Sequence, residues 1–303
     1  GLRFNGTTAG AANLNGAAGN GIVANLTNGA MGQLIVNNFQ IQGSGLNGVN
    51  LGLNNSQLVG SSFTSGQIDN NGANNVAGSR DGLRIVADNK SNIGTRATQT
   101  PGLVLDRVTL QNDAVNPRPQ QHGVDVSVDG NSFVGLSVLN GSIIHNDGDG
   151  VLATVNPNGS LSDTSLLVMN FDHTNVSNNW GDGFHVTAQN GTDDVTPPQT
   201  SGAIINFANG NINNNGNFIN APATGIVGDG IGDGIDATAT GDGSVAGNTQ
   251  ITFNFNNANI LGNEEQALNT AMSNGGSVNL NLVGGSISGA LNVPCADGPL
   301  AYV

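Results

Sequence analysis

A four-residue line, Gly followed by an apolar, a variable and an apolar residue, recurs along this chain and limits what it can fold into. Successive side chains of a strand point to opposite faces, so the first and third residues after Gly face inward and the second faces outward. A solenoid uses one such line in every coil. The line begins at Gly21-Ile22-Val23, recurs at Gly48-Val49-Asn50-Leu51, Gly82-Leu83-Arg84-Ile85, Gly123-Val124-Asp125-Val126, Gly150-Val151-Leu152-Ala153, Gly183-Phe184-His185-Val186 and Gly234-Ile235-Asp236-Ala237, and ends at Ala267-Leu268-Asn269-Thr270.

A second column, an apolar residue with Asn three positions later, lies just upstream of the Gly line. Asn tolerates the left-handed conformation that a tight turn needs, and its amide can hydrogen-bond to an equivalent amide one rung away. We therefore expect a stacked Asn ladder inside the turns. The pairs are Ile68/Asn71, Ile143/Asn146, Val176/Asn179, Ile212/Asn215 and Ile260/Asn263, with Thr109/Asn112 and Ile41/Ser44 as substituted members.

The spacing between the two columns predicts where insertions emerge. The ladder residue usually precedes the Gly line by four residues, but the distance is eleven in two rungs and nineteen in another. A solenoid places the same turn of every rung on one side, so the loops 72–81, 113–122 and 216–233 should form one contiguous surface. Loops on a rigid scaffold commonly carry function, and we expect this surface to contact a partner or glycan.

One complete rung can be read between Gly123 and Gly150. Strands are expected at 124–128, 133–139 and 142–144, with Asp-Gly-Asn and Asn-Gly turns between them. Three short strands in about 27 residues, each pairing in parallel with its equivalents about 4.8 Å away, form a β-helix. Its coiling should be right-handed, as crossover connections nearly always are. The sequence thus predicts an all-β, right-handed parallel β-helix solenoid of about eight three-strand rungs.

The expected organisation is a single β-helix domain over residues 1–303. Regular rungs run over about 20–290, and 1–19 and 291–303 form terminal segments. The repeat is already under way near the first residue, so we expect a segment of a larger protein. Neither terminal segment offers a full cap, and an open rung exposes apolar core and unpaired backbone groups. We therefore expect end-to-end self-association, or stacking on neighbouring rungs of the parent protein.

The lines at 146–151 and 179–184 both read Asn-x-Gly-Asp-Gly followed by Val or Phe. They resemble the right-handed parallel β-helix repeat of the pectate-lyase-like superfamily, which also occurs in long bacterial surface proteins and adhesins. The resemblance covers roughly residues 20–290. It implies the fold and leaves the activity open, because this superfold hosts lyases, hydrolases, esterases, tailspikes and passive adhesins alike.

Composition narrows the classes of partner. Only 9% of residues are charged, and 21 acidic residues against 7 basic ones give a net charge of −14. Neutralising phosphates needs Lys and Arg, so nucleic acid and anionic polysaccharides are poor partners. The apolar share of 37%, in short alternating runs, argues against disorder, and no run is long enough for a membrane-spanning helix. A single cysteine, Cys295, excludes an internal disulfide and a cysteine-rich metal site.

Asp-Gly turns carry the first candidate site. Asp149, Asp182 and Asp233 each precede the Gly of consecutive rungs, and Asp229 lies nearby. Stacked carboxylates about 5 Å apart repel one another, and a bound cation relieves that repulsion. Ca²⁺ suits carboxylate and backbone oxygens in flexible turns, so these four residues are the predicted metal ligands. The alternative is that Asp-Gly simply makes good turns.

The outward row of the Gly line carries the second candidate. Asp125, His185 and Asp236 could supply a general acid and base in a groove along this face, as in β-helix enzymes that the chain resembles. The opposing interpretation is that Arg84–Asp125 and His185–Asp236 are ordinary cross-strand pairs. The lyase and polygalacturonase signatures, such as Gly-His-Gly and Arg-x-Lys, are absent from the sequence.

Candidate ligand-binding residues are Trp180 on the turn edge, His122 and Arg84. One exposed Trp can serve as a sugar platform, or it can pack over neighbouring turns. Two hypotheses follow. The first is a non-catalytic extracellular structural or adhesive β-helix, such as a surface fibre, stalk or matrix component. The second is a polysaccharide-active β-helix lyase or glycoside hydrolase that acts on a neutral or weakly charged glycan.

Overall fold

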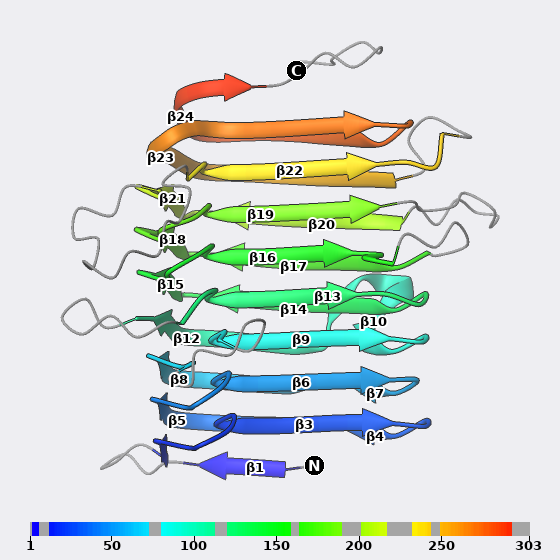
Figure 1. Cartoon of the computed structure of the whole chain (residues 1–303), viewed down its shortest axis with the longest axis vertical. Coiled ribbons are helices and arrows are strands. Elements are labelled where there is room, and N and C mark those ends of the chain that lie inside the picture. The colour runs from blue at the N-terminus through cyan, green and yellow to red at the C-terminus, as the bar shows by residue number, and fades with distance from the viewer. Residues whose placement is uncertain are drawn as a thin grey trace.

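The computed structural model describes eight stretches of the chain and shows a stack of β-strands (Figure 1). The 24 strands of the described stretches form one hydrogen-bonded sheet, and all of their pairings are parallel except that of β10 with β11. In these stretches the helical content is one 3-10 turn, η1 (Arg96–Thr98), and no helix is long and apolar enough to span a membrane. The predicted all-β, parallel, solenoid-like architecture is confirmed. The described residues are 2–5, 12–72, 80–112, 120–158, 164–189, 201–216, 232–243 and 249–292.

The strands occupy three faces, and one pass of the chain through all three is a rung. The first face holds β3 (Ile22–Thr27), β6 (Val49–Asn54), β9 (Leu83–Asp88), β13 (Val124–Val128), β16 (Val151–Val155), β19 (Phe184–Gln189), β22 (Ile235–Thr240) and the end of β23 (Thr249–Ser273).

The second face holds β1 (Leu2–Asn5), the first parts of β5 (Leu34–Gln42), β8 (Ser61–Asp69) and β12 (Leu103–Gln111), then β14 (Phe133–Leu139), β17 (Leu166–Asp172), β20 (Ser201–Ala208) and the first parts of β23 and β24 (Ser277–Asn292). Short strands β4 (Met31–Gly32), β7 (Gln57–Leu58), β10 (Asn92–Thr95) and β11 (Thr100–Pro101) lie just before it. The third face holds β2 (Ala12–Asn15), the last parts of β5, β8 and β12, then β15 (Ser142–Ile144), β18 (Asn175–Ser177), β21 (Asn211–Asn213) and the later parts of β23 and β24.

The Gly line folds in the expected register. Its variable residues pair from rung to rung, with Arg84 opposite Asp125 and His185 opposite Asp236. The apolar residues on either side of them face inward, and Val124, Val126, Phe184 and Val186 are fully buried. The alternation of a strand's side chains therefore decides both the core and the outward row, as the sequence predicts.

Glycine opens the line because the backbone of the next rung approaches it closely. A Cβ on Gly183 would stand 2.5 Å from the carbonyl oxygen of Gly234, 2.6 Å from Ile212 and 2.8 Å from the amide of Asn215. Any larger residue would push the rungs apart or displace the ladder.

The Asn ladder is confirmed as a buried chain of amide contacts. Asn146 donates its backbone N–H and its amide to Oδ1 of Asn179, at 3.1 and 2.8 Å. Asn179 repeats both bonds to Asn215, and Asn215 repeats both to Asn263. Each link satisfies buried donors that would otherwise cost about 1–3 kcal/mol apiece.

The prediction is wrong for one member of the ladder, the pair Thr109/Asn112. Leu110, not Thr109, pairs with Ile68 and Ile143 and is buried. The ladder position of this rung is then filled by Gln120, which accepts from Asn71 and donates to Oδ1 of Asn146 at 2.8 Å. Asn112 instead closes the ends of the insertion by exchanging two hydrogen bonds with Gln120. The longer Gln side chain reaches the ladder after the insertion has re-entered the rung.

Left-handed backbone at one corner of the rungs accounts for part of the Asn content. The turn from the second to the third face places one such residue in each successive rung, and only Asn, Gly and a few others adopt that region readily. Two of these side chains also contact each other across rungs, since the amide of Asn257 lies 3.5 Å from Oδ1 of Asn209. The corner residues are Asn38, Ser65, Arg107, Asn140, His173, Asn209, Asn257 and Gly284.

Candidate functional site

A second ladder runs along the edge where the third face turns into the first, at the position just before each Gly line. Each side chain accepts the backbone N–H of the equivalent residue one rung further on. Thus Asp182 donates its N–H to Asp149 Oδ1 at 2.9 Å, and Asp233 donates its N–H to Asp182 Oδ1 at 2.7 Å. The accepting members that the structure describes are Asn20, Asn47, Asp81, His122, Asp149, Asp182 and Asp233, and Gln266 donates its N–H to Asp233 Oδ1.

This edge ladder gives the Asp-Gly turns a structural role. We call Asp149, Asp182 and Asp233 the acidic column, and the structure stacks them in consecutive rungs as expected. One oxygen of each carboxylate is engaged by a main-chain N–H of the next rung. Burial raises the pKa of Asp233 to about 6, with the charge of Asp182 adding to the effect. The calcium prediction remains a prediction, and its fourth ligand, Asp229, lies outside the described residues.

His122 is a neutral member of the ladder. Its Nδ1 accepts the N–H of Asp149 at 3.2 Å, so the same atom cannot also donate to Asp149 Oδ2, which lies 3.5 Å away. Burial lowers the pKa of His122 to about 4, in agreement with an uncharged ring. With the residue only 8% exposed, His122 offers a ligand little surface. Its geometry makes it a structural acceptor.

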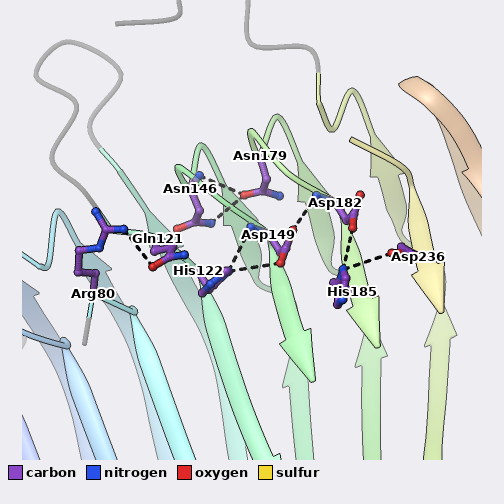
Figure 2. A network of polar contacts seen from close by, with 9 residues as sticks. All are labelled: Arg80, Gln121, His122, Asn146, Asp149, Asn179, Asp182, His185 and Asp236. Atoms are coloured by element: carbon purple, nitrogen blue, oxygen red, sulfur yellow. Dashed lines mark hydrogen bonds and ion pairs between the residues drawn. The ribbon is translucent and has the colours of Figure 1, made fainter. Parts of the chain in front are cut away.

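His185 sits at the centre of a charged cluster in the next rungs, shown in Figure 2. Its Nδ1 lies 3.1 Å from Asp182 Oδ2 and 3.4 Å from Asp236 Oδ2. The hydrogen bond with Asp182 is the largest cause that raises the pKa of His185 to about 9, and burial opposes it. The charges of Asp149, Asp236 and Asp182 add to the rise, so the ring is an imidazolium at neutral pH. We call Asp182, His185 and Asp236 the histidine cluster.

Asp125 stands apart from this cluster. Leu152 pairs with Asp125 on one side and with His185 on the other, so a full apolar rung separates the two polar residues. Asp125 instead binds Arg84, whose Nε lies 3.2 Å from its Oδ2. The structure therefore brings together two of the three candidate catalytic residues, and it ties Arg84 into a cross-strand ion pair that leaves its side chain partly exposed.

Trp180 lies half-buried on the same turn edge, next to the acidic column. Its backbone N–H donates to the carbonyl of Asn146 at 2.9 Å, which fixes it to the preceding rung. Residues 73–79, 113–119 and 217–231, the greater part of the predicted contact loops, lie outside the described residues. Two ends of the first two insertions are adjacent, because Gln121 donates its N–H to the carbonyl of Arg80. Arg80 also donates from its guanidinium to the side chain of Gln121 at 3.1 Å (Figure 2).

Sequence reasoning missed the contact between Asp182 and His185. The signal was their spacing: Asp182 and His185 are three positions apart, on either side of the Gly that opens the strand. Buried carboxyl groups along this edge were also missed. Burial raises the pKa of Asp81 to about 7 and that of Asp147 to about 6.

These features define the class of protein: an all-β chain of parallel strands stacked in solenoid-like fashion, with a polar ladder and a charged histidine cluster along one edge. Comparison with protein-family models, with curated proteins and with solved structures gave no match to the chain.

Proposed function

We propose that this chain is a right-handed parallel β-helix of about eight three-strand rungs that serves as a non-catalytic structural or adhesive element outside the cell. The handedness rests on the rule that parallel crossovers are nearly always right-handed. Resemblance of the repeat to bacterial surface proteins and adhesins supports the extracellular, cell-surface role. The net charge of −14 supports a surface that stays soluble and avoids nucleic acid.

The observation that carries this proposal is the use of polar side chains as rung-to-rung links. On the second face, Asn206 donates to Asn170, Asn254 to Asn206 and Asn281 to Asn254, each at 2.7 Å. On the third face, Asn211 donates to Asn175 at 2.8 Å. Such ladders stiffen a stack along its long axis. They also use, in hydrogen bonds between rungs, the polar side chains that a sugar-binding groove would offer to a ligand.

The last described rung supports end-to-end assembly. Leu282 occupies the inward position of Phe255, which is 2% exposed, yet Leu282 is 46% exposed. Val278 and Leu280 at neighbouring inward positions are only partly buried. Among the described strands, β24 pairs with β23 alone. Burying one such side chain stabilises an interface by about 1.5–3 kcal/mol. The occupant we propose is the first rung of a second copy, stacked head to tail.

Light scattering and electron microscopy of the purified chain test this assembly. We expect concentration-dependent oligomers or fibres, more abundant at high salt because the copies share a net negative charge. Leu282→Lys, at an inward position, should abolish them. Val283→Lys, at the adjacent outward position, should leave them unchanged because Val283 is already 65% exposed.

A monomer at every concentration and salt, or equal assembly by the two variants, would refute end-to-end stacking of copies. A monomer that assembles only when further repeats are fused to it would assign the open rung to the parent protein.

A polysaccharide-active enzyme is the second candidate, favoured by the contact between His185 and Asp236 on the outward row of the first face. The imidazolium could protonate a leaving-group oxygen while a carboxylate acts as base. A panel of neutral glycans, assayed for new reducing ends and for unsaturated products, tests it. Product formation that His185→Gln abolishes would replace the structural role with this one.

A further inference from the structure

The geometry of the histidine cluster points to a binding site for a divalent transition-metal ion, held by Nδ1 of His185 and by one carboxylate oxygen each of Asp182 and Asp236. We propose this site independently of the structural role. It differs from the predicted calcium site in two of its three ligands, and it lies on the outward face instead of within the turn column.

Distances within the cluster match a shared ion. The three ligand atoms all lie within 4.8 Å of one another, and Nδ1 is 3.1 and 3.4 Å from the two carboxylate oxygens. Nitrogen and oxygen ligands that sit about 2.1 Å from one metal ion are separated by about 3.0–3.4 Å in tetrahedral or octahedral geometry. Two of the three ligand-to-ligand distances therefore already match a bound ion, and the Asp236 side chain, which is partly exposed, can rotate to adjust the third.

The surroundings hold these ligands in place. Asp182 Oδ1 accepts the N–H of Asp233 at 2.7 Å. Its other oxygen, Oδ2, points toward His185 (Figure 2). His185 and Asp236 are fixed by parallel pairing of β19 with β22, two rigid strands rather than loops. Hydrogen bonds that orient a ligating carboxylate commonly change metal affinity about 10–100-fold. The solvent side of the cluster is open, which leaves room for water ligands.

The donor set selects the class of metal. One imidazole nitrogen with two carboxylates suits Zn²⁺, Mn²⁺, Fe²⁺ or Co²⁺, whereas Ca²⁺ prefers six to eight oxygens. Nδ1 must be free of a proton to bind a metal ion, so binding releases protons and should weaken as pH falls.

Titration calorimetry of the whole chain with Zn²⁺ tests the site, with Co²⁺ absorption as a second readout of the ligand set. We expect one ion per chain. His185→Gln should weaken binding at least about 100-fold and Asp236→Asn about 10-fold, both with the native gel-filtration volume and β circular dichroism. The matched control is His173→Gln, because His173 lies 3.0 Å from one carboxylate, Asp172, but belongs to no cluster of three among the described residues. It should bind as the native chain does.

Three results would overturn the proposal. The first is the absence of Zn²⁺ binding at submillimolar concentration. The second is native Zn²⁺ affinity in a folded His185→Gln variant, and the third is an equal loss of affinity in His173→Gln and His185→Gln. Should His185→Gln fail to fold, Asp236→Asn decides alone, and native affinity in that variant would equally count against the site.

Discussion

Asp81 is expected to destabilise the native fold at neutral pH, and Asp81→Asn should reveal it. Asp81 is 2% exposed, and its Oδ2 is buried with no hydrogen-bond partner in the described part of the chain. Burial, with the charge of Asp125 as a second cause, raises its pKa from 3.8 to about 7, and Arg84 opposes the rise. In the preceding rung Asn47 fills the same ladder position with an amide. Asn at 81 should therefore keep the ladder and remove the buried charge.

The sign follows from the direction of the pKa change. A carboxyl whose pKa is raised on folding binds more protons in the native state than in the unfolded state. The free energy of unfolding therefore falls as pH rises from about 4 through about 7. Each pKa unit is worth about 1.4 kcal/mol, which gives an upper limit of about 4 kcal/mol at pH 8 and about 2 kcal/mol at pH 5. The stability gained by Asp81→Asn should therefore grow by about 2–3 kcal/mol between these pH values.

Urea unfolding of the native chain and the variant at pH 5 and pH 8 measures this difference, and comparing the two chains at each pH cancels the other titrating groups. The matched control is Asn47→Asp, which places a second buried carboxyl at a site that is 1% exposed. It should lose stability, more at pH 8 than at pH 5. A gain for Asp81→Asn that is the same at both pH values, or larger at pH 5, would refute the reasoning.

Three further predictions concern the ladders and the close approach of rungs. Asn179→Ala removes an acceptor and a donor from the buried ladder and should cost about 3 kcal/mol or more in urea unfolding, whereas the exposed Asn175→Ala should cost under about 0.5 kcal/mol. Gly183→Ala should lower the melting temperature sharply or prevent soluble expression, and Gly19→Ala, with no atom within 4 Å of its added Cβ, should behave as the native chain. If the acidic column binds calcium, millimolar Ca²⁺ should raise the melting temperature above that in chelator, and a triple Asp→Asn variant of the column should lose the increment; identical melting curves would end the idea.

Most of the fold could be predicted because its signals are local. The Gly line indicates the period of two of a strand, and the Asn column indicates a turn that each rung repeats. Neither signal depends on distant residues. The error at Thr109 and Asn112 shows where local spacing fails. An insertion can fall before or after the ladder residue, and only pairing with the neighbouring rungs shows that Leu110 faces inward and that Gln120 completes the ladder.

The candidate site could likewise be predicted only in part from the sequence. From the sequence alone, Asp149, Asp182 and Asp233 fall at one turn position, and His185 and Asp236 fall on one outward row. Tertiary structure decided their roles, because it set the direction of each side chain. It turned Asp182 Oδ1 toward the next rung and Oδ2 toward His185, and it placed Leu152 between His185 and Asp125.

Sequence by itself determined the stacked strands, the buried residues and the position of the polar edge, since strand alternation and turn preferences act over a few residues. Which polar atoms meet across that edge was decided by tertiary structure alone. Contacts such as that of His185 with Asp236 join residues 51 positions apart, and their geometry depends on the parallel register of β19 with β22. The neutral state of His122 and the charged state of His185 have the same origin, because burial and neighbouring carboxylates, not residue type, set the two pKa values apart.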